Sequence, residues 1–446
     1  MKKPIVLLAA FINNFLGSSL GYSAGIIHFG LLEKFPESAS KVALAGALFT
    51  SVFCLAGPIS TTVINTLSCR SALFIGAFLN FAGFLVSSFS SNIELVVFCY
   101  GIISGIGQSM MYSASVLVAG YYFHKNVSVA TGVVVSGTGL GVTVFPMFTE
   151  FLLRAHGIDG TFLLLSAISL QTCVFTMCIG IHEIERERKS PQKFSTRLKL
   201  VVYDLRKLSS NGAFCLLCIS ILCWSTSLNT SVLFLPDYYK STGSSELQAA
   251  SLMSIYGVFN YFSRVITGLA ASDDQVDGKI LYMGSFVILS MCTALLPMVG
   301  TSFAGKVFYS IVLGLYSSGV WSLLTTITIE LIGIKQTSTA FGIEMLTSGI
   351  GFLSGPVIGN NIKEVSGGYS LVFVISGILY MMAGVFEVFM ILTMRKSGVL
   401  QSSEEQRRSI EIEDTMIRNG NEELENNKSD EEDERTIEIE ERQKLK

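Results

Sequence analysis

The sequence has few charged residues and few prolines, and both shortages set it apart from soluble proteins. Charged residues make up only 15% of the 446 positions, whereas an average soluble domain has roughly 25%. Hydrophobic residues make up 50%, so a soluble enzyme is not expected. Proline occurs only 8 times, and the 41 glycines and 31 phenylalanines beside it are typical of helices that pack closely in lipid.

Cysteine is present without any recognisable framework. Most of the 9 cysteines lie inside apolar runs, where an unpaired cysteine behaves as a small hydrophobic residue, so we expect no disulfide scaffold. Cys215 and Cys218 form a C-x-x-C pair, but their apolar setting argues against a redox or zinc site. The sequence offers no nucleophile, metal-ligand cluster or cofactor motif. We therefore expect no enzyme, catalytic residue, metal or cofactor, and no nucleic-acid partner.

Charge of each sign is concentrated in a different part of the chain. Residues 1–396 contain 23 Lys and Arg against 18 Asp and Glu, a formal charge of +5. Residues 397–446 contain 8 against 16, a formal charge of -8. This end includes an unbroken acidic block at 430–434 and cannot bury a core, so it is predicted to be a disordered acidic tail.

Twelve long apolar runs fill the rest of the chain. A membrane helix needs about 20 mostly apolar residues, because each residue rises about 1.5 Å against about 30 Å of hydrocarbon. The first run is free of charge for about 29 residues, longer than the apolar core of a signal peptide, so it is predicted to be a retained helix. The predicted helices lie near 4–32, 42–66, 71–93, 95–121, 127–149, 160–181, 213–236, 247–272, 280–300, 307–329, 336–362 and 365–394.

Basic residues indicate which side of the membrane each end faces. If the N-terminus is inside, 14 Lys and Arg lie on the cytoplasmic side and 6 on the opposite side, with the tail excluded. The positive-inside rule then places both termini in the cytoplasm. The hydrophilic segment 182–212 follows the sixth run and is predicted to be a cytoplasmic linker. Its alternation of basic and apolar residues at 194–206 fits either an amphipathic helix on the inner leaflet or a simple positively charged loop.

The two sets of six runs resemble each other in sequence. Residues 130–141 (ATGVVVSGTGLG) match residues 340–351 (AFGIEMLTSGIG) at a constant offset of 210. These glycines are interpreted as packing surface, because a phosphate-binding loop must follow a strand and this run lies in a predicted membrane helix. A duplicated six-helix unit with a cytoplasmic linker resembles the plan of the major facilitator superfamily, whose substrates lie near the midplane between the halves.

The predicted fold is therefore an all-α membrane protein of the major facilitator superfamily type, with twelve transmembrane helices in two pseudo-symmetric bundles. The predicted divisions are an N-terminal bundle (1–181), the linker (182–212), a C-terminal bundle (213–396) and the tail (397–446).

Arg264 is the main candidate for binding a substrate. It lies inside the eighth run, with about 12 Å of helix remaining before the next charged residue. An arginine at the centre of a membrane helix costs from about 2.5 kcal/mol upward, so such a residue usually faces a wet cavity or a partner. A substrate carboxylate fits the guanidinium with two parallel hydrogen bonds. The alternatives are an arginine that extends to the inner surface or pairs with a nearby acid.

Glu344 and His28 are the candidates for a proton or gating role. Glu344 lies about two turns from the inner end of the eleventh run, where it could pair with Arg264, gate the inner side or titrate. His28 is the one side chain of the first run expected to titrate near neutrality, but a solvated position near the outer surface explains it as well. Glu387 is expected to support the end of the twelfth helix and is given no substrate role.

Tyr112, Tyr22 and Asn260 are candidates for lining a substrate cavity, although hydrogen bonds between helices would explain such residues equally well.

Several motifs resemble the monocarboxylate transporter family of this superfamily, over residues 17–394. In that family the arginine of the eighth span helps to hold the substrate carboxylate, and the resemblance gives this role to Arg264. The most specific match is the signature that leads into the fifth span. The matching segments are Gly57-Pro58 with 67–70 (LSCR), 120–137, 234–243 and 257–268.

Two positions depart from the pattern of family members that move lactate with a proton. Those members have an aspartate one turn before the arginine, where this chain has Asn260, and a lysine in the first span, where this chain has no Lys or Arg between Pro4 and Leu32. We therefore expect a carrier of a small organic acid, amino acid or related solute that works by alternating access and facilitated diffusion. The alternatives are a proton-coupled monocarboxylate symporter that uses Glu344 or His28, and a non-transporting receptor on the same fold.

The expected partners are a carboxylate or amino-acid-like small molecule and the lipid bilayer. The resemblance also implies a single-span immunoglobulin-like chaperone and a location in the plasma membrane.

Overall fold

A computed structural model describes residues 3–123, 126–188, 203, 206–273 and 275–396. The chain divides into two compact units, 1–391 and 392–446, and both predicted bundles fall almost wholly in the first unit. The bundle boundaries at 181 and 213 therefore stay predictions. The acidic tail and nearly all of the basic stretch 194–206 lie outside the described residues.

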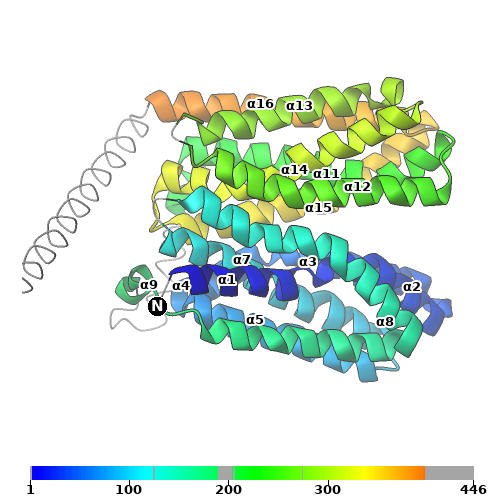
Figure 1. Ribbon diagram of the computed structural model, residues 1–446, viewed down its shortest axis with the longest axis horizontal. Coiled ribbons are helices and arrows are strands. Elements are labelled where there is room, and N and C mark those ends of the chain that lie inside the picture. The colour runs from blue at the N-terminus through cyan, green and yellow to red at the C-terminus, as the bar shows by residue number, and fades with distance from the viewer. Residues whose placement is uncertain (1–2, 124–125, 189–202, 204–205, 274, 397–446) are drawn as a thin grey trace, which may run out of the picture. The chain divides into compact units, whose positions relative to one another are not determined.

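Within the described residues, all regular secondary structure is helical (Figure 1). The N-terminal half contains α1 (Lys3–Asn13), η1 (Asn14–Ser18), η2 (Leu20–Ser23), α2 (Ala24–Lys34), η3 (Pro36–Ser38), α3 (Ala39–Leu55), α4 (Gly57–Thr66), α5 (Cys69–Phe89), α6 (Ile93–Val96), η4 (Val97–Ser104), α7 (Gly105–Tyr122) and α8 (Val127–Met177). The short helix α9 (Glu183–Arg188) follows. The C-terminal half contains α11 (Gly212–Ser241), α12 (Glu246–Ala270), α13 (Gly278–Val299), α14 (Phe303–Ile332), α15 (Thr337–Ser366) and α16 (Ser370–Lys396).

All twelve predicted membrane helices are present. A search of the described residues for helices that are long and apolar enough to cross a membrane finds ten segments. One of the ten, α8, contains the fifth and sixth predicted helices, which meet at Gly157. That glycine has a positive φ of 65°, a conformation that breaks the helix. The predicted ends at 149 and 160 are wrong, because helix continues on both sides of Gly157. The helix α12 is present in the structure but is not among the ten, because its polar residues, including Arg264, lower its mean hydropathy.

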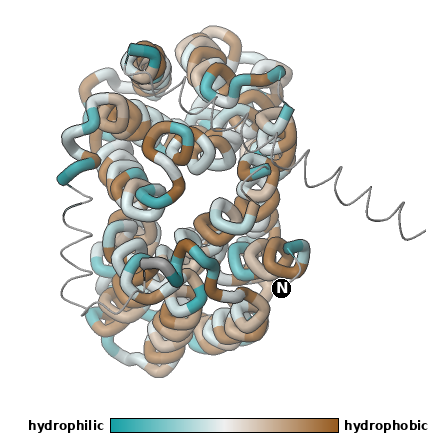
Figure 2. The backbone as a smooth tube through the Cα atoms, turned by 90° about the vertical axis from the view of Figure 1, so that its left-hand side faces the viewer, coloured by the Kyte–Doolittle hydropathy of each residue, from teal (hydrophilic) through white to brown (hydrophobic). Residues whose placement is uncertain are grey.

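The outer surface of the helices is apolar. Large hydrophobic side chains are more than half exposed on helices throughout the chain, among them Phe29, Phe78, Phe151, Leu269 and Met298. Viewed from one end of the helices, hydrophobic residues occur around the outside as well as within (Figure 2). A soluble monomer rarely exposes such a surface, whereas a bilayer covers it with lipid tails.

The first membrane helix is discontinuous. The α-helix gives way to a π-helical turn at Asn14–Ser18 and a 3-10 turn at Leu20–Ser23 before α2 begins. Side chains from neighbouring helices satisfy the carbonyls of this break: Gln108 of α7 donates to Ser18 O, and Asn80 of α5 donates to Gly17 O at 3.4 Å. A break of this kind is tolerated within a membrane when neighbouring helices supply the missing hydrogen bonds.

Glycines bring helices of the two halves into close contact, which supports their interpretation as packing surface. A Cβ atom on Gly132 of α8 would lie 2.7 Å from the carbonyl oxygen of Arg264 and 3.0 Å from the Cα of Gly268, both on α12. The matching Gly342 of α15 packs in the same way against α4, where a Cβ would lie 3.2 Å from Gly57 O. The offset of 210 in the sequence is thus repeated in the contacts between the halves.

The start of the linker is anchored to the N-terminal half. Figure 1 shows α9 and the beginning of α1 at the same end of the helices, which we call the linker side. The buried Glu185 accepts hydrogen bonds from the main-chain N–H of Cys69 (2.6 Å) and of His182 (3.1 Å). The His182 ring lies beside Tyr122, with 4.9 Å between ring centroids. These contacts dock the linker onto the first residue of α5 and the last turn of α7.

Acid should loosen this docked segment through His182. Burial lowers the pKa of the His182 imidazole below its ordinary value, with Lys3 acting in the same direction and Glu185 and Glu183 opposing it. The neutral ring is therefore favoured when docked. Its stabilisation is complete above the ordinary histidine pKa and is lost as the pH falls through the lowered value. We expect wild type to lose more melting temperature between neutral and acidic buffer than His182→Phe, which keeps an aromatic ring.

The exposed His156 provides the control, since His156→Phe should respond to acid as wild type does. An equal response of wild type and His182→Phe would show that this histidine does not control docking.

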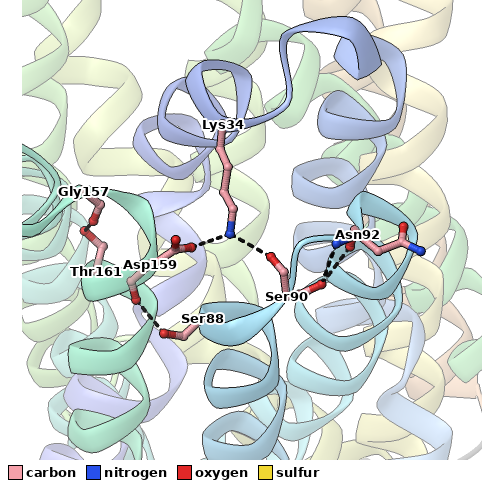
Figure 3. A network of polar contacts seen from close by, with 7 residues as sticks. All are labelled: Lys34, Ser88, Ser90, Asn92, Gly157, Asp159 and Thr161. Atoms are coloured by element: carbon pink, nitrogen blue, oxygen red, sulfur yellow. Dashed lines mark hydrogen bonds and ion pairs between the residues drawn. The ribbon is translucent and has the colours of Figure 1, made fainter.

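A polar network closes the opposite side of the N-terminal half (Figure 3). Lys34, the last residue of α2, donates to the Asp159 carboxylate at 2.5 Å and to Ser90 O at 2.7 Å. Ser88, near the end of α5, donates to the main-chain oxygen of Asp159 at 2.7 Å. The network therefore ties the ends of the first and third membrane helices to the start of the sixth, just after the break at Gly157.

A buried lysine closes the same side of the C-terminal half. Lys306 of α14 is only 3% exposed, and its ammonium group donates to Thr242 O (3.0 Å), Ser244 Oγ (2.7 Å) and Tyr239 O (3.4 Å). A cation suits this position because the last carbonyls of a helix, here α11, have no partners within the helix.

Replacing Lys306 with methionine should destabilise the protein. The change leaves buried acceptors without donors, which typically costs about 1–3 kcal/mol, so thermal unfolding in detergent should shift to lower temperature. Lys240→Met is the control on the same side, because Lys240 forms only an exposed ion pair with Glu246 (3.1 Å). Equal melting temperatures for the two variants would contradict a structural role for Lys306.

Candidate functional site

One face of α12 carries a line of three polar side chains. Tyr256, Asn260 and Arg264 are spaced by four residues, so they lie above one another on the helix. Arg264 Nε donates to Asn260 Oδ1 at 3.1 Å, and Asn260 Nδ2 donates to the Tyr256 hydroxyl at 3.3 Å. The amide of Asn260 therefore fixes the orientation of the guanidinium plane. Tyr256 is the member of this line that sequence analysis missed, although its four-residue spacing from Asn260 was visible.

The guanidinium of Arg264 reaches from one half of the protein to the other. Its Nη1 donates to Val135 O of α8 at 3.1 Å, and the residue is only 3% exposed. Among the described residues no carboxylate forms an ion pair with it, and none accepts a hydrogen bond from Nη2. Two alternatives from the sequence are therefore wrong. Arg264 does not extend to the surface, and it does not pair with an acid among the described residues. A buried cation without a counter-ion is costly and is expected where an anionic ligand supplies the missing charge.

The neighbouring helices hold the main chain of α12 in place around these side chains. Ser318 and Ser322 of α14 donate to Asn260 O (3.1 Å) and Arg264 O (3.0 Å). On the other side, a Cβ on Gly139 of α8 would lie 3.2 Å from Arg264 Cδ. Glycine at this position therefore gives the arginine side chain room between α8 and α12.

Aromatic rings from both halves pack around Tyr112. Tyr112 of α7 is 3% exposed, and its ring centroid lies 5.3 Å from Phe53, 6.1 Å from Trp321 and 6.2 Å from Phe341. Tyr112 also lies within electrostatic range of Arg264 and of Tyr22. These rings form an apolar cluster, and Tyr112 is its member that lies within electrostatic range of the guanidinium.

Tyr22 is the exposed member of the group. It lies in the 3-10 turn that follows the break in the first membrane helix, and it is 43% exposed. It is within electrostatic range of both Tyr112 and Tyr256. Of the three predicted lining residues, Asn260 is hydrogen-bonded to Arg264, Tyr112 lies within electrostatic range of Arg264, and Tyr22 lies within range of Tyr112.

The two predicted proton or gating residues lie apart from this group. Glu344 is buried in α15, where one carboxylate oxygen accepts from Thr328 Oγ1 at 2.6 Å, and it forms no ion pair with Arg264. The pairing of these two residues, one of the sequence-based alternatives, is therefore wrong. His28 is half-buried in α2, where its ring lies 6.0 Å from that of Phe29.

Hydrogen bonds between the halves close the linker side. Ser128 at the start of α8 and Thr326 of α14 are 3.0 Å apart, and Asn65 of α4 donates to Thr339 of α15 at 3.0 Å. Together with the glycine contacts of Gly132 and Gly342, these bonds separate the arginine from the linker side. The described residues contain no group of three or more His, Cys, Asp or Glu that could hold a metal ion.

Comparison with known proteins agrees with this architecture. The family model described as Major Facilitator Superfamily matches residues 5–343 and 272–422. Monocarboxylate transporter 2 of Rattus norvegicus is 24% identical over 401 residues, which cover 86% of this chain and 81% of the relative. Monocarboxylate transporter 6 of Homo sapiens is 27% identical over 399 residues, which cover 86% and 79%.

A solved structure shares the fold. The fucose:proton symporter of E. coli superposes with a TM-score of 0.68 at 14% sequence identity, over 87% of this chain and 98% of that one. The resemblance to monocarboxylate transporters found in the motifs is therefore confirmed over most of the chain. The chain belongs to the major facilitator superfamily, as a membrane-spanning secondary transporter whose relatives in sequence are monocarboxylate transporters.

Proposed function

We propose that this protein carries a small solute with a carboxylate group, an organic acid or an amino acid, and that Arg264 binds the carboxylate. The observation that carries the proposal is a buried guanidinium between the halves, with no ion-pair partner among the described residues. Asn260 orients the guanidinium, which leaves Nη2 available to a substrate oxygen. A bidentate carboxylate would supply both the charge and the acceptors that the site lacks.

The surroundings favour a solute that also has an apolar part. Tyr112 and its aromatic neighbours are contributed by both halves beside the arginine, and Tyr22 lies at the exposed edge of the group. Rings of this kind pack against apolar or aromatic groups of a ligand. We infer that the substrate is amphipathic, with its carboxylate on Arg264 and its apolar part against these tyrosines.

We infer that transport is facilitative. Asn260 occupies the position one turn before the arginine and cannot exchange a proton, while Glu344 and His28 make no contact with the guanidinium. Alternating access then consists of opening the contacts that close the linker side, which the positive-inside rule assigns to the cytoplasm. We propose both termini in the cytoplasm, a plasma-membrane location and a single-span immunoglobulin-like chaperone, in keeping with the resemblance to monocarboxylate transporters.

The test is uptake by proteoliposomes of labelled lactate, pyruvate, aromatic amino acids, creatine and carnitine, with and without a pH gradient. We expect one of these compounds to equilibrate at a rate that the gradient does not change and not to accumulate. Accumulation driven by the gradient would favour the second candidate, a proton symporter that uses Glu344, one of whose buried oxygens has no hydrogen-bond partner. Absence of flux for every compound would favour a receptor.

A further inference from the structure

The C-terminal half encloses a second polar cluster, away from Arg264. Glu344 of α15, Glu387 of α16 and Tyr282 of α13 are each 0% exposed. All three lie toward the linker-side ends of their helices, and Tyr282 is within electrostatic range of both carboxyl groups. We call these three residues the carboxyl cluster.

The carboxyl cluster lacks the hydrogen bonds that buried polar groups normally make. Within the described residues, both carboxyl oxygens of Glu387, one oxygen of Glu344 and the hydroxyl of Tyr282 have no hydrogen-bond partner. Ser220 of α11 lies beside Glu387, but it donates to the main-chain oxygen of Ala383 at 2.9 Å. In the part of the chain that the structure describes, the one direct donor is Thr328 of α14, whose hydroxyl donates to Glu344. Two ionised carboxylates in this setting would each lack the donors that an anion requires.

The titratable and charged groups around the cluster come from three helices. Cys218 of α11 lies within electrostatic range of Glu344, and Lys279 of α13 lies within range of Glu387. Lys279 is bonded to Glu330 of α14 at 2.6 Å and lies 3.4 Å from Asp277. The side chains of Glu330 and Asp277 are 33% and 43% exposed, so this group connects the cluster to solvent on the linker side.

A proton is the ligand that fits these features. Protonation replaces a buried anion that lacks donors by a neutral acid, which costs far less to bury. The new O–H bond forms on a carboxylate oxygen as an O–H bond of a hydronium ion at the linker side breaks and leaves water, and the charge of the cluster rises by one. The buried Lys279, which lies within electrostatic range of Glu387, and its partly exposed partner Glu330 mark the path by which the proton enters and leaves.

We propose that Glu344 and Glu387 form a proton-binding site in the C-terminal half, separate from the Arg264 site and loaded from the linker side. Proton binding itself does not depend on the proposed transport function. The test therefore needs neither a substrate nor flux, and its failure would leave the function of Arg264 untouched.

Infrared difference spectroscopy of the reconstituted protein tests the proposal. Wild type should show the C=O stretch of buried carboxylic acids in acidic and neutral buffer and lose it in alkaline buffer. Glu344→Gln and Glu387→Gln should each remove part of this signal, and Tyr282→Phe should shift its frequency because the phenol lies within electrostatic range of both carboxyl groups. Glu364→Gln, which changes an exposed carboxylate of α15, should leave the signal as in wild type.

Two results would overturn the proposal. One is the absence of this carboxylic-acid band from wild type at every pH, which would mean that both groups stay ionised. The other is a band that keeps its intensity into alkaline buffer, or that persists in the Glu344→Gln/Glu387→Gln double variant. If a variant fails to fold, the pH titration of wild type alone still shows whether the buried carboxyl groups bind a proton.

Discussion

Uptake of the carboxylate substrate should fall at least about 30-fold when Arg264 is replaced with alanine. Removing one member of a buried, hydrogen-bonded charge pair costs about 2–5 kcal/mol, and about 1.4 kcal/mol corresponds to a factor of ten. Initial rates per molecule of reconstituted protein measure the effect directly. The variant should still fold, because it removes a buried charge that no residue in the described part of the chain neutralises.

Two further variants separate charge from geometry. Arg264→Lys keeps the charge but not the planar fork, so it should recover only part of the lost rate. Arg154→Ala removes an arginine whose side chain is 80% exposed and should transport as wild type does. Unchanged uptake by Arg264→Ala would exclude this residue from the binding site.

Transport should also slow about tenfold when a methyl group is added at Gly268. The Cβ of alanine there would lie 2.7 Å from Ser128 O and 3.0 Å from the Cα of Gly132. Both neighbours are main-chain atoms of α8, so α8 and α12 must separate to admit it. Overpacking of this kind costs about 1–3 kcal/mol, enough to change the population of the closed linker side by about tenfold. We expect initial uptake rates to fall by a similar factor, measured on protein that reaches the membrane in normal amounts.

Gly257 gives a matched control on the same helix. A Cβ at this position meets only Thr143 Oγ1, at 3.7 Å, which is an ordinary contact. Gly257→Ala should therefore keep normal uptake. Normal uptake by Gly268→Ala as well would mean that this close approach of the halves is not required during the transport cycle.

The membrane helices could be predicted from the sequence, but the sequence feature that identifies them differs from helix to helix. Most are long enough and apolar enough to be found from composition alone. The helix α12 is not, and it was recognised as a run of 26 residues without charge except for Arg264. The break at Gly157 escaped the prediction of helix ends, because charged residues at 150–159 indicate an end to each of the two apolar runs, whereas both helices continue through these residues as far as Gly157.

The candidate site could be predicted only in part. The cost of burying an arginine identified Arg264, and its position relative to Asn260 follows from helical spacing. The carbonyl oxygen of Val135, which accepts from Arg264, is a main-chain atom of the N-terminal half. The side chain of Val135 therefore gives no sign in the sequence that this residue contacts the arginine. Likewise, the amino acid sequence does not show that Tyr22 follows a break in the first helix, since the break depends on Gln108 and Asn80 of distant helices.

The central claim is that Arg264 recognises a carboxylate, and one comparison tests it most directly. Initial uptake of the transported acid and of its uncharged primary amide is measured for wild type and for Arg264→Gln. Wild type should strongly prefer the acid, and Arg264→Gln should lose that preference while still moving the amide. Equal losses for acid and amide would contradict the account, because the arginine would then support the structure of the carrier without recognising charge.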